Sequence, residues 1–329
     1  MFSLCGRRSA VQCHRLTKVA RSLSTGTGIN QVGVVGLGLM GHGIAQIAAM
    51  AKEATYHVVA VEASQEAVDA GRGKMEASLG KMMDRQVKTG LATQEEADAR
   101  AQAVLSRVSY STDKGSLSDC DLVVEAITEN PKIKLPFYTD LGRITKPECI
   151  LASNTSSLSI MEMAEASGRA SHVVGLHFFN PVQMMKLVEV VHTEETDPLV
   201  FERCAQWVRS LGQHPVSCPD TPGFIVNRLL VPALAQGMLM LDRGDASCQD
   251  IDTAMELGAG HKMGPLTLAD YVGLDTCLSI LQGWVDKYPG EPAFVVPVCL
   301  REKVAAGKLG RKSGEGFYKW DSDRRAGVA

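Results

Sequence analysis

The chain has 329 residues, of which 45% are hydrophobic and 22% charged, and its formal net charge at pH 7 is −3. This length suffices for two domains with cores of their own, and the composition is that of an ordinary soluble globular protein. No uncharged apolar run approaches the length of a membrane span, and the nine cysteines contain no Cys-x-x-Cys pair, so we expect no membrane insertion, no disulfide framework and no metal site.

Residues 1–25 differ from the rest of the chain because they carry five basic residues, several serines and no acidic residue. This composition is typical of a mitochondrial transit peptide, and we predict a transit peptide and linker over 1–28. The alternative is a disordered basic tail that binds polyanions. Without these five charges the formal charge falls from −3 to −8. A body that acidic is a poor nucleic-acid binder, so no nucleic-acid partner is expected.

The first strand and helix predict a dinucleotide-binding loop. The apolar run 32–35 is followed directly by GLGLMG at 36–41 and then by a helical pattern. Glycines at the first, third and sixth positions allow a tight turn, the approach of a pyrophosphate to the backbone, and close packing of helix on strand. The helix N-terminus offers N–H groups to the phosphates. The motif alone is weak evidence, but here it lies between a strand and a helix, as the function requires.

Glu62 ends a second predicted strand, 57–61, and follows the last glycine of the loop by 21 residues. A carboxylate at this spacing accepts a hydrogen bond from a ribose 2′-OH and repels a 2′-phosphate. The pattern therefore predicts NAD rather than NADP, although a strand-end charge without a function is the alternative.

Residues 64–103 contain no convincing strand and predict a helical hairpin inserted between strands. Apolar residues recur at helical spacing over 74–87, Gly90 ends this helix, and the run 93–96 begins another with a capping box. The exposed basic residues of the first helix are expected to form a solvated face, or else to contact an anionic part of a substrate.

Alternation of strands and helices then resumes, with strands at 108–110, 121–126 and 150–153 and helices at 131–144 and from about 158. This alternation predicts a doubly wound, mostly parallel sheet, in which ligands bind beyond the carboxyl ends of the strands. The SNTSS run at 153–157 is expected to form a turn and helix cap; alternatively, one of its hydroxyls donates to a substrate oxygen. The residues at or just after such ends are Glu125, Glu129, Asn154, Ser156 and His177.

Two apolar runs, 173–179 and 187–191, flank a break and predict a pair of antiparallel strands. If the turn is centred on Gln183, His177 lies directly opposite Glu189, with Cβ atoms about 4.5–5.5 Å apart. The carboxylate would then hold the imidazole in one tautomer and stabilise its protonated form, as a general base near neutral pH requires. A surface ion pair of little consequence is the alternative, but both residues interrupt apolar strands, where an unpaired polar group is costly.

Strand signals end near 218–223, and helical segments follow through 241, over 248–257 and over 265–284. We therefore predict an α/β fold: a Rossmann-type, doubly wound, mostly parallel sheet with a helical hairpin insertion, followed by an all-α C-terminal domain. The predicted domains are an NAD-binding domain over 29–219 and a helical substrate and dimerisation domain over 220–329.

From residue 29 to residue 320 the chain resembles the mitochondrial short-chain L-3-hydroxyacyl-CoA dehydrogenase family. The resemblance implies reversible, NAD-dependent oxidation of (3S)-3-hydroxyacyl-CoA to 3-oxoacyl-CoA, the third step of fatty-acid β-oxidation. It also implies a homodimer formed through the helical domain and a mitochondrial matrix location. The motifs that carry it are SNTSS at 153–157, HFFNP at 177–181, Glu189, PGFIVNR at 222–228, GDAS at 244–247, MGP at 263–265 and GEGFY at 314–318.

The resemblance assigns roles residue by residue. His177 matches the catalytic base and Glu189 its partner, while Ser156 and Asn227 match substrate contacts. Together with Ser156, Ser78 and Arg85 match positions that touch coenzyme A. The family usually has Asp at position 62 and Lys at position 85, so each departure keeps its charge. The matched cofactor-binding residues are Gly36, Gly38, Leu39, Met40, Gly41, Glu62, Glu129, Lys134, Ser156 and Lys312.

Two other functions fit part of the sequence. The GLGLMG loop also suits a β-hydroxyacid dehydrogenase of the 3-hydroxyisobutyrate type, but such enzymes use a catalytic lysine in the helical domain, and here a His–Glu pair already fills that function. A catalytically silent dinucleotide-binding structural protein would have no need of the set His177, Glu189, Ser156 and Asn227.

Overall fold

The computed structural model describes residues 27–52, 54–322 and 324–329. Residues 1–26 of the predicted transit peptide lie outside the described residues. The chain forms two compact units, Met1–Thr221 and Pro222–Ala329. The predicted domain boundary, between residues 219 and 220, lies two residues before this division.

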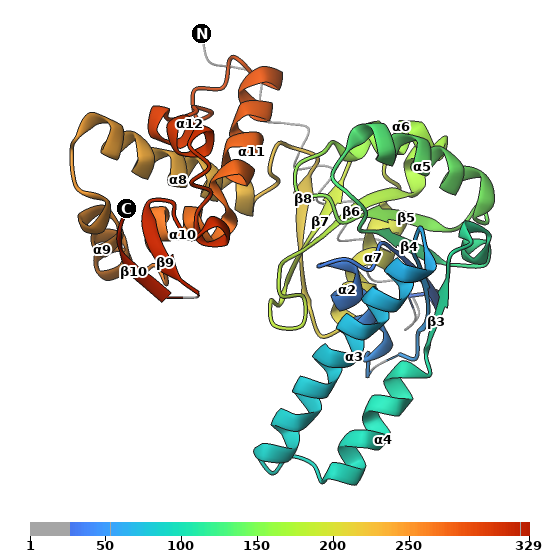
Figure 1. Cartoon of the computed structure of the whole chain (residues 1–329). Helices are drawn as coiled ribbons and strands as arrows, with labels where there is room; N and C mark the ends of the chain where they lie inside the picture. The colour runs from blue at the N-terminus through green and yellow to red at the C-terminus, as the bar shows by residue number, and fades with distance from the viewer. Residues whose placement is uncertain (1–26, 53, 323) are drawn as a thin grey trace. The chain divides into compact units, whose positions relative to one another are not determined.

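The first unit is built on an eight-stranded sheet with the order β3-β2-β1-β4-β5-β6-β7-β8 (Figure 1). Neighbouring strands are parallel except β6 and β7, which form an antiparallel pair. The fold class predicted from the alternation of strands and helices is confirmed. The strands are β1 (Gln31–Val35), β2 (His57–Val61), β3 (Val108–Ser111), β4 (Leu122–Glu125), β5 (Ile150–Ser153), β6 (Val173–Phe178), β7 (Leu187–His192) and β8 (His214–Pro219).

The predicted helical hairpin is present as α3 and α4, which run side by side away from the sheet (Figure 1). Its second helix begins with the expected capping box, because Thr93 Oγ1 accepts from Glu96 N at 3.2 Å and the Glu96 carboxylate accepts from Thr93 N at 2.9 Å. The helices of this unit are α2 (Gly41–Ala49), α3 (Gln65–Lys88), α4 (Gln94–Leu105), α5 (Pro131–Ile144), α6 (Ile160–Ser167) and α7 (Pro198–Ser210).

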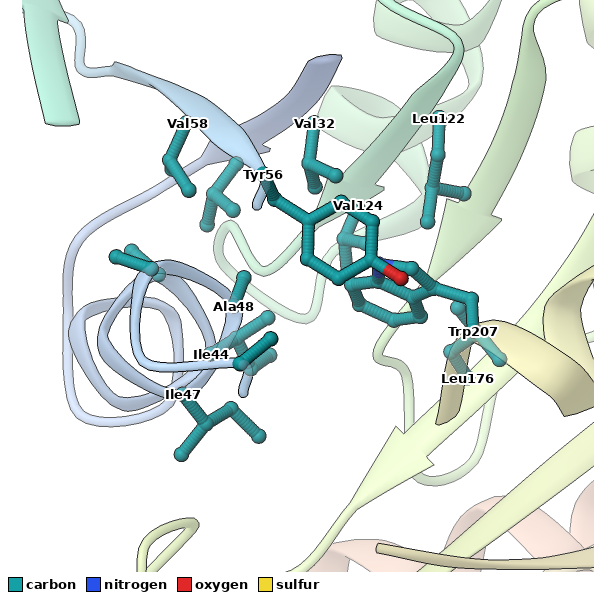
Figure 2. Packing of buried hydrophobic residues seen from close by; sticks show 14 of the residues in the cluster. Val32, Ile44, Ile47, Ala48, Tyr56, Val58, Leu122, Val124, Leu176 and Trp207 are labelled. Atoms are coloured by element: carbon teal, nitrogen blue, oxygen red, sulfur yellow. The ribbon is translucent and has the colours of Figure 1, made fainter. Parts of the chain in front are cut away.

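One face of the sheet carries the main core, formed with α2 and α7. Figure 2 shows Ile44 and Ala48 of α2 facing the strands, and Tyr56 beside Trp207 of α7. The two rings meet edge to face with centroids 6.4 Å apart, and the Tyr56 hydroxyl lies 2.6 Å from Ser210 Oγ. Aromatic side chains bury large apolar areas, so this pair helps to hold α7 on the sheet.

Alternate residues of a strand face opposite sides of the sheet, and this places the predicted catalytic pair. Leu176 and Val190 belong to the α2–α7 core, so their neighbours His177 and Glu189 project from the other face. That face is covered by α6, because a Cβ added to Gly175 would lie 3.0 Å from Ile160 Cδ1.

β8, at the edge of the sheet, has no counterpart in the elements expected from the sequence. Its sequence, HPVSCP, contains two prolines and reads as a turn. Proline has no N–H to donate to a neighbouring strand, but at an edge one side of the strand needs no partner. β8 pairs only with β7 among the described strands, so its prolines are tolerated.

The second unit is helical, with two differences from the expected arrangement. The segment predicted as one helix over 265–284 is divided at Gly273, which has φ +99°. The unit is also not all-α, because an antiparallel hairpin of β9 (Tyr318–Asp321) and β10 (Arg324–Val328) closes it. Its helices are α8 (Val226–Arg243), α9 (Cys248–Gly258), α10 (Pro265–Val272), α11 (Leu274–Lys287) and α12 (Val298–Ala305).

Asp270 attaches the start of this hairpin to α10. It is 1% exposed and accepts hydrogen bonds, each 2.9 Å long, from Phe317 N, Tyr318 N and Trp320 Nε1. A Cβ added to Gly316 would lie 2.0 Å from Asp270 Oδ1, so only glycine fits there. The glycine of the GEGFY motif therefore has a packing role.

Asp252 of α9 plays the same part for the start of α10. It is also 1% exposed, and it accepts from Leu266 N and Thr267 N, both at 2.8 Å, and from the Tyr318 hydroxyl at 2.9 Å. A Cβ added to Gly264 would lie 2.3 Å from the Asp252 side chain, which explains the glycine of the MGP motif. Backbone N–H donors satisfy both buried carboxylates.

Candidate active site

The predicted register of the β6–β7 hairpin is confirmed. His177 of β6 pairs with Glu189 of β7, and His177 Nδ1 lies 2.6 Å from Glu189 Oε2. The histidine is 6% exposed and the glutamate 0%, and the ring of Phe179 lies against the imidazole with centroids 4.5 Å apart. A hydrogen bond to a carboxylate places the hydrogen of the neutral imidazole on Nδ1, which makes Nε2 the basic nitrogen.

Asn154, just after β5, holds the ends of three strands together. Its backbone N–H donates to the Glu125 carbonyl oxygen at 2.8 Å, and its side-chain oxygen accepts from Phe178 N at 2.9 Å. These bonds fix the chain next to His177 to the ends of β4 and β5. The sequence places Asn154 at a strand end, but gives no signal that its side chain accepts a hydrogen bond from β6.

Glu129 gathers the SNTSS turn around its carboxylate. It accepts from Ser156 N at 3.0 Å and from Ser157 Oγ at 3.3 Å, and also from the Thr155 hydroxyl. The run forms the expected turn and a shell that positions Ser156, but it does not supply the expected helix cap. The N-cap of α6 is Ser159, two residues beyond the run, and its side chain accepts from Glu162 N at 3.4 Å. Two of the predicted cofactor-binding residues, Glu129 and Ser156, lie together.

Lys134 of α5 is 1% exposed and lies between two carboxylates. Its Nζ is 2.9 Å from Glu125 Oε1 and 2.8 Å from Glu129 Oε2. Desolvation works to raise the pKa of Glu129, but the charge of Lys134 and the hydrogen bonds from Thr155 and Ser156 hold that pKa below its usual value. Lys134 therefore stabilises the loop that carries Glu129.

Glu125, at the end of β4, is a buried residue of this site for which the sequence analysis assigns no role. Its exposure is 0%, and it accepts from Ile127 N and Ser153 Oγ, each at 2.8 Å, besides Lys134. Its position at a strand end was visible in the sequence, but its bonds depend on α5, which comes later in the chain. Beside it, desolvation raises the pKa of the buried Tyr138 well above its usual value.

The glycine loop has the shape that a dinucleotide requires. Gly36 has φ +87°, and a Cβ there would lie 2.7 Å from the Ala126 carbonyl oxygen. A Cβ on Gly41 would lie 1.7 Å from the Gly36 carbonyl oxygen, so the third glycine lets helix and turn pack closely. Gly38, in contrast, has no atom within 4 Å of an added Cβ, which leaves open space where a pyrophosphate would approach the backbone.

Glu62 lies beside this loop, as its spacing predicts. Its carboxylate accepts from the backbone N–H of Leu37, inside the loop, and from Ala63 N at 3.2 Å. The loop, the start of α2 and this carboxylate together fit a pyrophosphate and an adjoining ribose.

Ser78 and Arg85 both lie on α3, two turns apart and therefore on nearby faces of the helix. Ser78 Oγ accepts from Gln183 Nε2 at 3.2 Å. Arg85 is exposed. The structure thus places both residues on the inserted hairpin.

Asn227 and Lys312 belong to the second unit. Asn227 is in the first turn of α8, and Lys312 Nζ lies 2.5 Å from Asp275 Oδ1. Their contribution to the site stays a prediction.

Within residues 27–52, 54–322 and 324–329, no group of three or more His, Cys, Asp or Glu side chains is arranged to hold a metal ion. Among the helices of the same residues, none is long and apolar enough to cross a membrane.

Comparison with known proteins supplies the family. Two family models match the chain: "3-hydroxyacyl-CoA dehydrogenase, NAD binding domain" over residues 31–221, and "3-hydroxyacyl-CoA dehydrogenase, C-terminal domain" over residues 223–320. Together they span nearly all of the described chain.

Individual relatives agree. The mitochondrial hydroxyacyl-coenzyme A dehydrogenase of Rattus norvegicus is 48% identical over 294 residues, covering 89% of this chain and 91% of the relative. A probable 3-hydroxybutyryl-CoA dehydrogenase of Deinococcus radiodurans is 46% identical, covering 88% and 99%. The crystal structure of (S)-3-hydroxybutyryl-CoA dehydrogenase PaaH1 from Ralstonia eutropha matches with a TM-score of 0.83 at 38% identity, covering 89% of this chain and 100% of that one.

These matches confirm the predicted fold class, the NAD cofactor and the enzyme class, and they set aside the 3-hydroxyisobutyrate type. An alcohol-oxidising enzyme needs a base and a nucleotide site, and the first unit contains a His–Glu pair and a glycine loop whose geometry is compatible with these roles. The chain belongs to the 3-hydroxyacyl-CoA dehydrogenase family of NAD-dependent oxidoreductases.

Proposed function

We propose that this protein catalyses the reversible oxidation of (3S)-3-hydroxyacyl-CoA to 3-oxoacyl-CoA in the mitochondrial matrix, with His177 as the general base and Glu189 as its partner. The observation that carries the proposal is the buried 2.6 Å contact between His177 Nδ1 and Glu189 Oε2 at the end of β6. A polar pair in an apolar strand pair is costly to bury, and proton transfer gives it a function.

The proton path follows from the tautomer. His177 Nδ1–H donates to Glu189, so Nε2 takes the proton of the substrate hydroxyl as C3 is oxidised. The ring becomes positively charged in a buried site, and the Glu189 carboxylate compensates this charge without itself taking the proton. In the reverse direction Nε2 returns the proton to the carbonyl oxygen.

Bound NAD supplies the hydride acceptor for C3. The residues proposed to hold it are Gly36, Gly38, Leu39, Met40 and Gly41 at the pyrophosphate, Glu62 at the ribose, and Glu129, Lys134, Ser156 and Lys312. The open space above Gly38 and the carboxylate of Glu62 beside Leu37 N support this assignment.

Ser156 and Asn227 are proposed to align the reacting oxygen and the thioester carbonyl, since hydride transfer requires close, aligned atoms. The hydrogen bond from Ser156 N to Glu129 fixes the backbone that carries the Ser156 hydroxyl. Ser78 and Arg85 on α3 are proposed to contact the coenzyme A part of the substrate.

A homodimer through the second unit is part of the proposal. Leu229 of α8, Leu257 of α9 and Val298 of α12 are 71%, 83% and 61% exposed, and contact with a second copy would remove such apolar surface from water. Sedimentation velocity of the protein without residues 1–28 checks this, and a monomer at micromolar concentration would reject it.

The test of the catalytic assignment is His177→Gln, followed as NADH oxidation with acetoacetyl-CoA. We expect turnover to fall about 10²- to 10⁴-fold, the usual contribution of a general base, while NADH still binds. The matched control is His214→Gln, since His214 is an exposed histidine of the same unit. Normal turnover in His177→Gln would reject the assignment, and no turnover in the wild type would favour a catalytically silent protein.

A further inference from the structure

Three polar side chains from three separate elements meet beside the catalytic hairpin. They are Gln46 of α2, Ser78 of α3 and Gln183 in the turn between β6 and β7. Gln183 Nε2 donates to Gln46 Oε1 at 2.9 Å and to Ser78 Oγ at 3.2 Å. Gln46 is 0% exposed, so this cluster lies partly in the interior of the first unit.

The cluster is held rigidly. A Cβ added to Gly43 would lie 2.9 Å from Val182 Cβ and 3.2 Å from Gln183 Nε2, so α2 packs directly on the turn. The turn itself is closed by Met184 N and Met185 N, which donate to the Pro181 carbonyl oxygen at 3.0 and 2.9 Å. The Gln183 amide therefore has little freedom to move away from Ser78.

An apolar side chain could fill the same space without the cost of burying an amide. The arrangement does something that an apolar residue would not, because it sets the hydrogen-bonding role of Ser78. One amide hydrogen of Gln183 is used on Gln46 and the other on the oxygen of Ser78. The amide hydrogen occupies one lone pair of the Ser78 oxygen and turns the hydroxyl hydrogen away from Gln183, which leaves that hydrogen available to donate to a ligand.

We propose that Gln183 is a positioning residue that orients the Ser78 hydroxyl as a donor to the coenzyme A part of the substrate. The inference rests on the proposed function, in which Ser78 contacts coenzyme A. It also connects two parts of the site, because the turn that carries Gln183 joins the strands of His177 and Glu189.

The test compares two substrates with the full enzyme. Acetoacetyl-CoA contains the whole of coenzyme A, whereas the acetoacetyl thioester of N-acetylcysteamine lacks the nucleotide part of coenzyme A. In Gln183→Met, we expect KM for acetoacetyl-CoA to rise about 5- to 10-fold, the effect of a lost neutral hydrogen bond. kcat, KM for NADH, and KM for the short thioester should stay within about 2-fold of wild type, because neither NADH nor the short thioester needs Ser78 in this role.

A double-mutant cycle separates positioning from mere support. If Gln183 acts through Ser78, adding Gln183→Met to Ser78→Ala changes KM for acetoacetyl-CoA no further. The matched control is Gln86→Met, which removes an amide from α3, the helix that carries Ser78. In the wild type, Gln86 Oε1 accepts from Arg100 Nη1 at 3.0 Å. This control should leave both thioesters unaffected.

Equal losses on both thioesters, additive effects in the cycle, or an unchanged KM for acetoacetyl-CoA would each overturn the inference. Should Gln183→Met fail to fold, as judged by its thermal melting, Gln183→Glu retains the size of the side chain while removing its donors, and the same KM pattern is expected. A wild-type enzyme that turns over neither thioester would instead reject the proposed function.

Discussion

Buried carboxylates occur in both units of this protein, but they have different partners. In the first unit, Glu189 faces an imidazole and Glu125 faces the ammonium of Lys134. In the second unit, Asp270 accepts hydrogen bonds only from N–H groups of the segment that it holds, and charged groups act on it only from a distance. The partner indicates whether a buried carboxylate has a role in proton transfer or a structural role, because an imidazole can exchange a proton and a backbone N–H cannot.

The difference also appears in the pKa values. Burial works to raise the pKa of both Glu129 and Asp270. For Glu129, the charge of Lys134 and several hydrogen bonds outweigh burial and leave the pKa below its ordinary value. For Asp270, burial dominates the opposing N–H bonds, and the pKa lies above its ordinary value. A nearby cation thus decides whether the pKa of a buried carboxylate lies below or above its ordinary value.

The largest effect is expected where the partner exchanges a proton. In Glu189→Gln, the amide can still accept from Nδ1 but cannot compensate the charged imidazolium, so kcat should fall about 10²- to 10⁴-fold. Steady-state NADH oxidation measures this, and thermal melting shows that the protein is folded. A kcat within about 3-fold of wild type would mean that Glu189 has a structural role like that of Asp270.

Lys134→Met should have the next largest effect, on stability. It leaves Glu125 buried without its cation, and breaking a buried pair in this way typically costs about 3–5 kcal/mol. The control is Lys114→Met, because the side chains of Lys114 and Asp140 are 49% and 43% exposed and the loss of this surface pair should change the unfolding free energy far less. Urea unfolding gives both values, and equal losses in the two variants would contradict the assigned burial.

Asp270→Asn tests the structural role of the buried carboxylate in the second unit. The amide keeps one acceptor oxygen but loses the other, so a buried N–H of the hairpin is left without a partner, at a cost of about 1–3 kcal/mol. Asp245→Asn is the control, because Asp245 is 42% exposed and pairs with Arg243 at the surface. An unchanged unfolding free energy in Asp270→Asn would show that the hairpin is held by other contacts.

Local patterns predict the elements that local chemistry determines. α5 is found at the predicted residues 131–144, because Asn130 caps it and Pro131 suits its first turn. The pairing of His177 with Glu189 follows from the symmetry of the two apolar runs about Gln183, since a shift of one residue would turn every side chain to the wrong face.

Two features that local patterns do not predict are the C-terminal hairpin and the contacts of Lys134. The β9–β10 hairpin depends on Asp252 and Asp270, which lie 47 or more residues away, and its own sequence has little strand pattern. Lys134 matches a cofactor position, yet its two carboxylate partners emerge only when α5 packs beside β4. Neither set of contacts follows a helical or strand period, so neither can be predicted from the hydrophobic periodicity of the sequence.

The smallest expected effect is a pair of opposite pH dependences. Glu129 has a folded-state pKa below its ordinary value of 4.5, so its contribution to stability is full above pH 4.5 and is lost as the pH falls through the folded-state pKa. Asp270 has a folded-state pKa above 3.8, so its contribution is full below pH 3.8 and is lost as the pH rises through the raised pKa. The unfolding free energy of wild type relative to Glu129→Gln should therefore grow from pH 3.5 toward pH 6, whereas that relative to Asp270→Asn should shrink.

The change for Glu129 should stay below about 1 kcal/mol, because its side chain is 37% exposed and water screens the charge of Lys134. Urea titrations of the three proteins across this range decide the point. Slopes of the same sign would mean that the lysine does not govern Glu129 and that the two units treat their carboxylates alike.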